Sequence, residues 1–306
     1  MFEMIARYKH GGITWVDLES PTQGEVRALM EEFGLNQIVA EELLLPTLRP
    51  RMEAYDNFLY LILHFPALRH THTSREQELD FIIGKDFLIT TRYDTIDPLH
   101  KFSKVFEVNS VLDKSNIGEH AGFLFFYILK KMYRSIDHEI EYVVDELEEI
   151  EQKIYGGFEK EMVVSISNVG RDLLNLRQAI EPHRDILRSL EASGPAFFGD
   201  DFRPYIGALS SEYYRVHNHI MRNHESMREL RETNNSLLFT KQNEAMKVIA
   251  ILAFVTFPLS LIASIFGMNT AHLPIVGHPF DFWIIIGVMG MLTVIFFAFF
   301  KYKRWL

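Results

Sequence analysis

The chain has 306 residues, a net charge of −10 and no cysteine. The acidic balance argues against a nucleic-acid partner, which needs a basic surface. The lack of cysteine excludes a disulfide framework and a thiolate metal site. Residues 1–12 lack the long apolar run of a signal peptide. The sequence has no Walker-type loop, Gly-x-Ser-x-Gly or His-Glu-x-x-His motif, so we predict that the chain is not an enzyme.

Residues 1–118 predict an α/β domain. Ile13–Leu18 has the composition of a strand, and a helix is expected from about Ser20 to Gly34, with Pro21 in its first turn. Buried strands are predicted at residues 58–63 and 79–83, and a hairpin turn at residues 84–86 leads into a strand at residues 87–91. Strands interleaved with helices predict layers, here an α/β/α domain.

Residues 119–244 predict a helical stalk. Apolar residues alternate in steps of four and three over residues 126–154 and again over 162–190, separated by Gly156-Gly157. This pattern is typical of two long helices packed as an antiparallel coiled-coil hairpin. We expect Pro182 to bend the second helix and Gly194-Pro195 to end it.

A third stalk helix leads toward the C-terminal apolar segments. It has no Pro or Gly between Ala208 and Phe257, so it is predicted to continue without interruption into the first of these segments. Acidic residues crowd the first stalk helix over residues 137–151. They are interpreted either as a solvated helix face or as a surface that attracts cations.

Two C-terminal segments predict membrane spans. Residues 245–268 and 282–300 are the two spans, since their apolar, uncharged stretches match a hydrocarbon core of about 30 Å. Residues 269–281 form the external loop, which has no Lys or Arg from Thr270 to Asp281, and residues 301–306 form a basic tail. The positive-inside rule then predicts an inner (plasma) membrane protein with both termini in the cytoplasm.

Apart from Phe257, one side of the first span consists of small or hydroxylated residues. Ala250, Ala253, Phe257, Ser260, Ser264 and Gly267 recur at steps of three and four, which places them on one helix face. Met246 and Asn243 extend this stripe below the membrane. Two interpretations remain open on spacing alone: a close packing face between helices, or the wall of a pore. Pro258 predicts a local bend.

The outer end of this span resembles the CorA family of divalent-cation (magnesium/cobalt) transporters, the two-span Gly-Met-Asn family. The motif is Phe266-Gly267-Met268-Asn269, and residues 243–248 and 258–263 resemble the family's entry to this helix and its middle. The likeness extends to Trp15-Val16-Asp17-Leu18, to residues 49–53 and to residues 84–90. It therefore covers nearly the whole chain, and it favours the pore over the packing face.

The resemblance implies an α+β membrane protein that forms a homopentameric channel in membrane lipid. Each subunit would contribute its first span to the pore, with Gly267, Met268 and Asn269 as the selectivity filter. A ring of Asn269 would hold the hydrated ion through its water. The pore would be lined by the stripe together with Ile249: Asn243, Met246, Ile249, Ala250, Ala253, Phe257, Ser260 and Ser264.

The expected activity is influx of Mg²⁺, and of Co²⁺ and Ni²⁺, down the membrane potential. The sequence leaves two alternatives: a zinc transporter of the same superfamily, as in the ZntB branch, and a membrane-anchored coiled-coil scaffold that transports nothing. His70, His72, His217, His219 and His224 are interpreted as surface histidines rather than a zinc site.

Some family members have a regulatory metal site, made by an Asp near the sheet and an Asp on the long helix. The expected helix position is Ala208 in this chain, and residues 69–76 contain no Asp. Asp80, Asp201 and Glu212 are weak substitutes, so a regulatory Mg²⁺ site is left unassigned. The acidic outer loop of the family is also replaced, by residues 272–276, which leaves Asp281 near the outer mouth.

Overall fold

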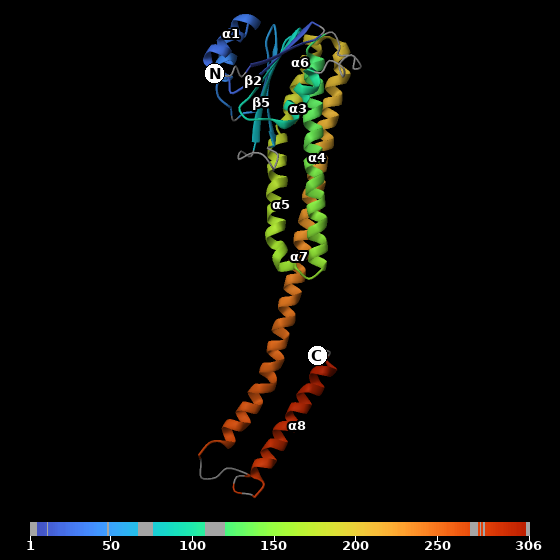
Figure 1. The fold of residues 1–306 in the computed structure, drawn as a ribbon. Helices are drawn as coiled ribbons and strands as arrows, with labels where there is room; N and C mark the ends of the chain where they lie inside the picture. The colour runs from blue at the N-terminus through green and yellow to red at the C-terminus, as the bar shows by residue number, and fades with distance from the viewer. Residues whose placement is uncertain are drawn as a thin grey trace. The chain divides into compact units, whose positions relative to one another are not determined.

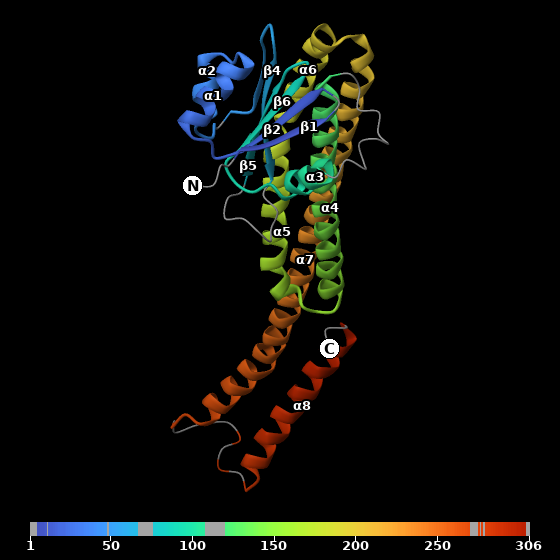
Figure 2. The ribbon, with the colours of Figure 1, turned by 45° about the horizontal axis from the view of Figure 1, so that its top comes forward.

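The computed structural model describes residues 5–10, 12–47, 49–66, 76–107, 120–269, 275, 277 and 279–303. The chain divides into two compact units, residues 1–231 and residues 232–306. Helix α7, Arg203–Phe266, begins in the first unit and ends in the second. Figures 1 and 2 show the order of the elements along the chain.

The first unit contains a six-stranded sheet in the order β1-β2-β6-β5-β4-β3. Its strands are β1 Ile5–His10, β2 Ile13–Glu19, β3 Arg51–Ala54, β4 Leu59–Pro66, β5 Glu76–Ile83 and β6 Phe87–Arg92. Strands β2 and β6 are parallel, and the other four pairs are antiparallel. The four predicted strands and the tight turn between β5 and β6 are confirmed. The short edge strands β1 and β3 were not predicted.

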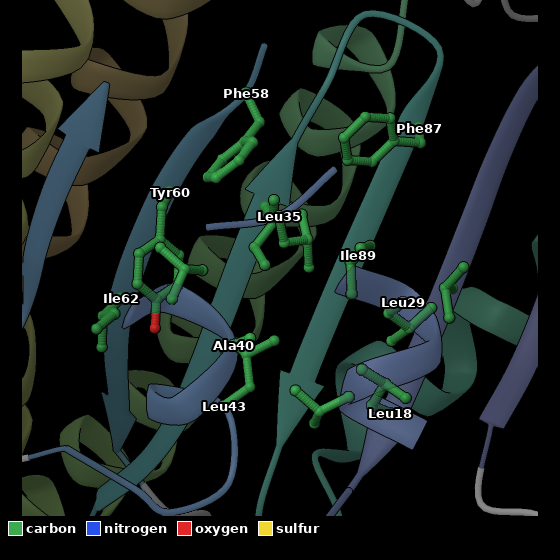
Figure 3. Packing of buried hydrophobic residues seen from close by; sticks show 14 residues of the cluster. Leu18, Leu29, Leu35, Ala40, Leu43, Phe58, Tyr60, Ile62, Phe87 and Ile89 are labelled. Atoms are coloured by element: carbon green, nitrogen blue, oxygen red, sulfur yellow. The ribbon is translucent and has the colours of Figure 1, made fainter. Parts of the chain in front are cut away.

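Two helices, α1 (Gln23–Phe33) and α2 (Gln37–Glu42), contribute to the core on one face of the sheet. Alternate residues of a strand point to the same face, so Tyr60 and Ile62 of β4 meet Leu29 of α1 and Leu43 after α2 in one buried cluster (Figure 3). This cluster holds the two helices on the sheet.

Helix α1 begins at Gln23, three positions after Ser20, where the sequence predicts its start. Thr22 is its N-cap, and its hydroxyl accepts a hydrogen bond from the Glu25 backbone N–H, while Glu25 Oε2 accepts one from the Thr22 N–H. This reciprocal capping box fixes the start of the helix, so Pro21 lies before the first turn and not within it. Gly34 ends the helix as expected, with the positive φ of 66° that favours glycine.

The opposite face of the sheet packs against α3 (Asp97–Glu107) and α4 (Gly122–Tyr155). The rings of Phe81 on β5 and Phe125 on α4 meet edge to face at 5.1 Å, and Trp15 on β2 meets Phe102 on α3 at 5.9 Å. The sheet therefore has helices on both faces, and the predicted α/β/α layering is confirmed.

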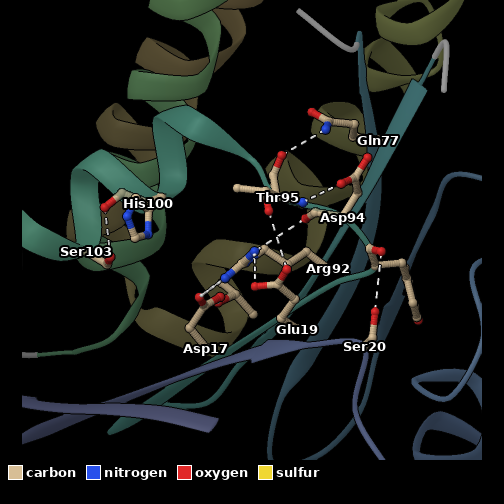
Figure 4. Close-up of polar contacts among 11 residues, drawn as sticks. Asp17, Glu19, Ser20, Gln77, Arg92, Asp94, Thr95, His100 and Ser103 are labelled. Carbon is tan, nitrogen blue, oxygen red and sulfur yellow. Dashed lines mark hydrogen bonds and ion pairs between the residues drawn. The ribbon is translucent and has the colours of Figure 1, made fainter. Parts of the chain in front are cut away.

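A buried polar network fastens β2 to β6 at the carboxyl end of the parallel pair (Figure 4). Arg92 Nη2 lies 3.3 Å from Asp17 Oδ2, and Arg92 Nη1 lies 2.8 Å from Glu19 Oε2. Thr90 donates a 2.6 Å hydrogen bond to Asp17. Burial raises the pKa of Asp17, although the Arg92 charge and the Thr90 hydrogen bond act in the opposite direction. The network thus compensates a carboxylate that burial would otherwise disfavour.

The stalk hairpin consists of α4 and α5 (Glu159–Ile180), which turn at Gly156-Gly157 as predicted. Figures 1 and 2 both show these helices side by side. Pro182 interrupts the helix at the predicted place: α5 ends at Ile180, and a separate helix, α6, runs over His183–Phe198, where one bent helix was predicted. Proline lacks the N–H that would continue the hydrogen-bond ladder of α5.

The predicted break at Gly194-Pro195 is wrong. Helix α6 continues through both residues and ends at Gly199, whose φ is 104°. Gly194 is buried, and a Cβ there would lie 2.5 Å from Ile206 Cδ1 of α7. Its lack of a side chain therefore serves close helix packing and not helix termination. A short 3₁₀ turn, η1 Asp200–Phe202, leads into α7.

The second unit contains the end of α7 and helix α8, Asp281–Tyr302. Helix α7 is continuous over 64 residues, which confirms the predicted uninterrupted third helix, and Pro258 lies within it. Both α7 and α8 contain segments long and apolar enough to cross a membrane. The two predicted spans are therefore helical as expected.

Candidate functional site

The outer end of α7 is closed by the backbone of its glycine-containing motif. The Gly267 N–H donates a 2.9 Å hydrogen bond to the Ala263 carbonyl, and the Met268 N–H donates one of 3.3 Å to the Ile265 carbonyl. A Cβ on Gly267 would lie 3.0 Å from the Ala263 oxygen. Glycine thus lets the last turn close, so that Met268 and Asn269 follow the helix as exposed residues.

One side of α7 within the second unit is partly covered. Ile251 is only 7% exposed, and Phe300 of α8 is only 3% exposed. The rings of Phe254 and Phe300 lie 6.4 Å apart. Val255, Pro258 and Ile262, at helical spacing from Ile251, are half-buried. These contacts identify the side of α7 that is covered within its own unit.

The candidate pore stripe lies on the other side of α7. Ser260 follows Ile251 by nine residues, about two and a half helical turns, which places it opposite the covered side. Ser260 and Ser264 are exposed, and Phe257 is 72% exposed. Asn243, Met246 and Ile249 are exposed too, while Ala250 and Ala253 are half-buried. The small and hydroxylated face is therefore the face that α8 leaves uncovered.

No charged side chain lies along this segment from Val248 to Phe266. The hydroxyl of Thr256, which is off the stripe, donates a 2.8 Å hydrogen bond to the Leu252 carbonyl, so its polarity is satisfied inside the helix. The stripe can therefore offer neutral oxygens to water but no carboxylate to a bare metal ion.

The second unit has almost no core of its own. Ile251 and Phe300 are the only buried hydrophobic residues between positions 232 and 303 in the described part of the chain. Large apolar side chains such as Leu252, Phe282 and Met291 are more than half exposed. Exposed apolar surface on this scale needs lipid or neighbouring protein to cover it.

The acidic face of α4 is partly neutralised. Asp137 lies 2.8 Å from His219 Nδ1 and 3.5 Å from Arg215, both on α7. Glu149 pairs with Lys153 on its own helix. These contacts support the interpretation as a structural and solvated face for part of the acidic set. Attraction of cations by the remainder stays a prediction.

The histidines do not form a metal site in the described part of the chain. No group of three or more His, Asp or Glu side chains there could hold a metal ion. His219 is paired with Asp137, and His70 and His72 lie outside the described residues. The outer-loop residues 272–274 also lie outside them.

The three weak candidates for a regulatory metal site lie in different surroundings. Asp80 on β5 is completely buried beside tyrosine hydroxyls, and Asp201 in η1 is exposed. Glu212 on α7 pairs with Arg215 at 2.8 Å. In the described part of the chain, none of the three belongs to a group of three or more side chains that could hold a metal ion. We therefore assign no metal ligand among them.

Sequence reasoning missed a buried polar contact at the joint of sheet and stalk. His183 occupies an apolar position of the heptad pattern, but its ring lies between the Tyr133 hydroxyl, 3.0 Å from Nδ1, and the His64 carbonyl, 2.8 Å from Nε2. Burial lowers its pKa to about 4. A neutral ring therefore donates through Nε2 and accepts through Nδ1. The signal available in the sequence was a histidine at a core position directly after Pro182.

The sequence matches the family described as CorA-like Mg²⁺ transporter protein over residues 10–304. This chain belongs to that family. Members of the CorA-like family are membrane transporters, which confirms the prediction that the chain is not an enzyme and supports a membrane location. The likeness to the CorA family inferred from the Gly-Met-Asn motif is likewise confirmed.

Relatives of this CorA-like chain match it along nearly its whole length. The cobalt/magnesium transport protein CorA of Thermotoga maritima is 25% identical over 298 residues, covering 96% of this chain and 83% of the relative. The protein of the same name from Methanocaldococcus jannaschii is 24% identical and is covered to 92%.

Solved structures show the same fold. The complete structure of the CorA magnesium transporter from M. jannaschii superposes with a TM-score of 0.83 at 22% identity, covering 96% of this chain and 92% of that one. The cytoplasmic domain of ZntB from Vibrio parahaemolyticus superposes with a TM-score of 0.53 at 15% identity, covering 76% of this chain and 88% of that one. The full-length architecture is therefore that of a CorA transporter.

Proposed function

We propose that this chain forms a homopentameric channel that conducts hydrated Mg²⁺ into the cytoplasm. The observation that carries the proposal is the uncharged stripe on the side of α7 that α8 leaves uncovered, which ends at Gly267-Met268-Asn269. One chain supplies only two spans, and two helices cannot enclose a channel. Several copies with this stripe turned toward a common axis would enclose one.

Hydrated passage fits the chemistry of this stripe. Mg²⁺ gives up its water reluctantly and prefers carboxylate oxygens when it does so. The stripe offers the Ser260 and Ser264 hydroxyls and the Asn243 amide, but no carboxylate. A ring of Asn269 carbonyl oxygens would accept hydrogen bonds from the first-shell water of the ion. Selection would then depend on the size and charge of the hydrated ion.

Apolar side chains would close the pore. Met246, Ile249 and Phe257 are each more than half exposed on the uncovered side of α7. Rings of such residues around an axis exclude water when they approach one another, and an ion cannot cross without water. Closure by dewetting therefore needs no charged gate.

The membrane potential would supply the driving force. With both termini in the cytoplasm, a divalent ion moving inward gains about 4.6 kcal/mol per 100 mV, since one charge gains about 2.3 kcal/mol. Influx of Mg²⁺, Co²⁺ or Ni²⁺ then needs no other energy source. The accessibility of single cysteines introduced by Glu3→Cys and by Trp305→Cys, in spheroplasts and in inverted vesicles, would test this orientation.

The deciding experiment is ion flux through the purified protein in proteoliposomes. Asn269→Ala should reduce Mg²⁺ uptake at least tenfold while the oligomer elutes unchanged, because it removes the oxygens that hold the hydrated ion. Asn235→Ala, an exposed amide on the same helix below the membrane, is the matched control and should keep full flux. Wild-type flux in Asn269→Ala would remove Asn269 from the selectivity role.

Competition separates the metals in the same assay. Uptake of Mg²⁺ is measured against Co²⁺, Ni²⁺ and Zn²⁺ in turn, with and without a proton gradient. Preference for Zn²⁺ with dependence on the gradient would favour a zinc transporter. Absence of any flux from a correctly assembled oligomer would favour a scaffold instead of a channel.

A further inference from the structure

Strand β5 carries two buried acids next to each other on the face that holds α1 and α2. Glu78 and Asp80 are two residues apart, so both side chains point to this face, together with Ile82 of the core cluster. Asp80 is 0% exposed and Glu78 is buried. In the register of the sheet, His64 of β4 lies opposite Glu78.

Each acid has partners for only one of its two oxygens. Glu78 Oε2 accepts a 2.7 Å hydrogen bond from the Thr47 backbone N–H and lies 3.2 Å from His64 Nε2. Asp80 Oδ2 accepts long hydrogen bonds from the hydroxyls of Tyr60, at 3.4 Å, and Tyr93, at 3.5 Å. Glu78 Oε1 and Asp80 Oδ1 are both buried, and neither has a partner if both acids are ionised.

Among the described residues, His64 is the one basic side chain that pairs with Glu78, and none pairs with Asp80. The His64 ring of β4 contacts two acids of β5, Glu76 through Nδ1 and Glu78 through Nε2. Arg51 of β3 lies over the Tyr60 ring, but its guanidinium is paired with Glu42 and Glu53. Among the described residues, no Lys or Arg forms an ion pair with Glu78 or Asp80. Burial of two neighbouring carboxylates favours a state in which the pair carries one negative charge instead of two.

We propose that Asp80 and Glu78 share one proton, held between Asp80 Oδ1 and Glu78 Oε1, so that the cytoplasmic sheet contains a proton-binding site occupied at neutral pH. The proton makes the Asp80 carboxyl a donor to Glu78, which lies two residues away on the same face of β5. Both unpartnered oxygens are satisfied by this single proton, and the pair carries one negative charge instead of two.

The electrostatics agree with this geometry. Burial raises the pKa of Asp80, and the Glu78 charge and hydrogen bond raise it further. Burial lowers the pKa of His64, but the hydrogen bond to Glu78 and the charges of Glu78 and Glu76 outweigh it, so the net pKa is raised. The raised pKa of His64 favours a positive charge on its ring, which would offset the negative charge that the acid pair retains.

The site is connected to the stalk through β4. The His64 side chain faces Glu78, while its backbone carbonyl accepts the hydrogen bond from His183 at the start of α6. Strand β3 pairs with β4 only from Leu59 to Ile62, which leaves this carbonyl free of the sheet ladder on that side. Loss of the shared proton would therefore change the charge next to His64, the residue whose carbonyl joins the sheet to α6.

The shared proton predicts a sign for the pH dependence of folding. An unfolded Asp loses its proton at about pH 4, whereas the folded state keeps this proton at higher pH. The stabilisation is therefore complete below about pH 4 and is lost as pH rises toward the raised pKa of folded Asp80. Each pH unit in that window should change the unfolding equilibrium constant about tenfold.

The test compares the full-length wild type with Asp80→Asn in detergent. Asparagine keeps a donor toward Glu78 and an acceptor for the tyrosines but cannot ionise. Urea unfolding is followed by Trp15 fluorescence in a Trp283→Phe, Trp305→Phe background. Between pH 5 and pH 7, the unfolding equilibrium constant of the wild type should rise about tenfold per pH unit relative to that of Asp80→Asn. Parallel curves for the two proteins would overturn the proposal.

Asp56→Asn is the matched control, because Asp56 is an exposed acid of the same unit. Its curve should stay parallel to that of the wild type. If Asp56→Asn reduced the pH dependence of the unfolding equilibrium constant as much as Asp80→Asn does, the assignment of the proton to the buried pair would be overturned.

A second measurement does not depend on how the variants fold. The infrared difference spectrum between wild-type protein labelled with ¹³C-aspartate and unlabelled protein should contain the band of a protonated aspartic acid at pH 7.5. This band should not change on addition of Mg²⁺ or EDTA. Absence of this band would overturn the proposal. Its loss on addition of Mg²⁺ would overturn it as well, because the two oxygens would then hold a cation.

Discussion

The two units of this chain bury their apolar residues in opposite ways. In the first unit, Trp15, Leu61 and Phe81 are completely buried between the sheet and its helices. In the second unit, Phe257 and Leu252 project from α7 with more than half of their surface exposed. The first unit therefore contains what it needs to fold, whereas the apolar surface of the second needs lipid or neighbouring protein to cover it.

Because of this difference, we expect the first unit to determine the stability of the protein and the stripe of α7 to determine transport. Burying a large apolar side chain contributes about 1.5–3 kcal/mol in a water-soluble core. Between helices in lipid that driving force is absent, and packing of small residues and hydrogen bonds take its place. Substitutions in the first unit should therefore change the free energy of unfolding, and substitutions on the stripe of α7 should change ion flow.

The largest effect on stability is expected from Phe81→Ala. Phe81 is 0% exposed and packs against Phe125, so the truncation leaves a cavity beneath the sheet. We expect a loss of about 3–5 kcal/mol in the free energy of unfolding, measured by urea titration of the full chain in detergent. A loss below about 1 kcal/mol would mean that this face of the sheet is not a packed core.

A pH-dependent effect is expected from His183. Its folded-state pKa of about 4 lies below its ordinary value of 6.5, so the unfolded state binds more protons between these two values. Stability is complete above about pH 6.5 and should fall by about 3 kcal/mol as pH falls to about 4.

His183→Gln tests this expectation, since glutamine can accept from Tyr133 and donate to the His64 carbonyl without titrating. The acid-induced loss should disappear when unfolding of the variant is measured from pH 7 to pH 4. An unchanged slope would place the titrating group elsewhere. Asp80 acts with the opposite sign over part of this range, and its contribution is common to both proteins.

The smallest effect on stability is expected from Phe257→Ala, the same substitution as Phe81→Ala at a side chain that is 72% exposed. The free energy of unfolding should change by less than about 0.5 kcal/mol. Leak through the closed channel should rise, because a ring of alanines would not exclude water. Single-channel recording measures the leak, and Leu252→Ala, off the stripe on α7, is the control. A wild-type trace for Phe257→Ala would reduce Phe257 to a packing residue.

Strongly periodic elements were predictable because their determinants are local. The apolar alternation over residues 126–154 predicted α4, and the uncharged stretch from Val248 to Phe266 predicted a span. The candidate filter could be located from the sequence because the Gly-Met-Asn motif consists of adjacent residues. The short edge strands β1 and β3 escaped prediction because pairing with β2 and β4 forms them, and their own composition does not.

The sequence by itself determined the two spans, the stripe of small residues on α7 and the motif at its end, since each depends on spacing along one helix. Only the tertiary structure decided that Gly194 packs against Ile206 and that His183 is a buried polar link. It alone brought Asp80, Glu78 and His64 together. These roles depend on residues distant in the sequence, which meet only when the sheet and the helices pack.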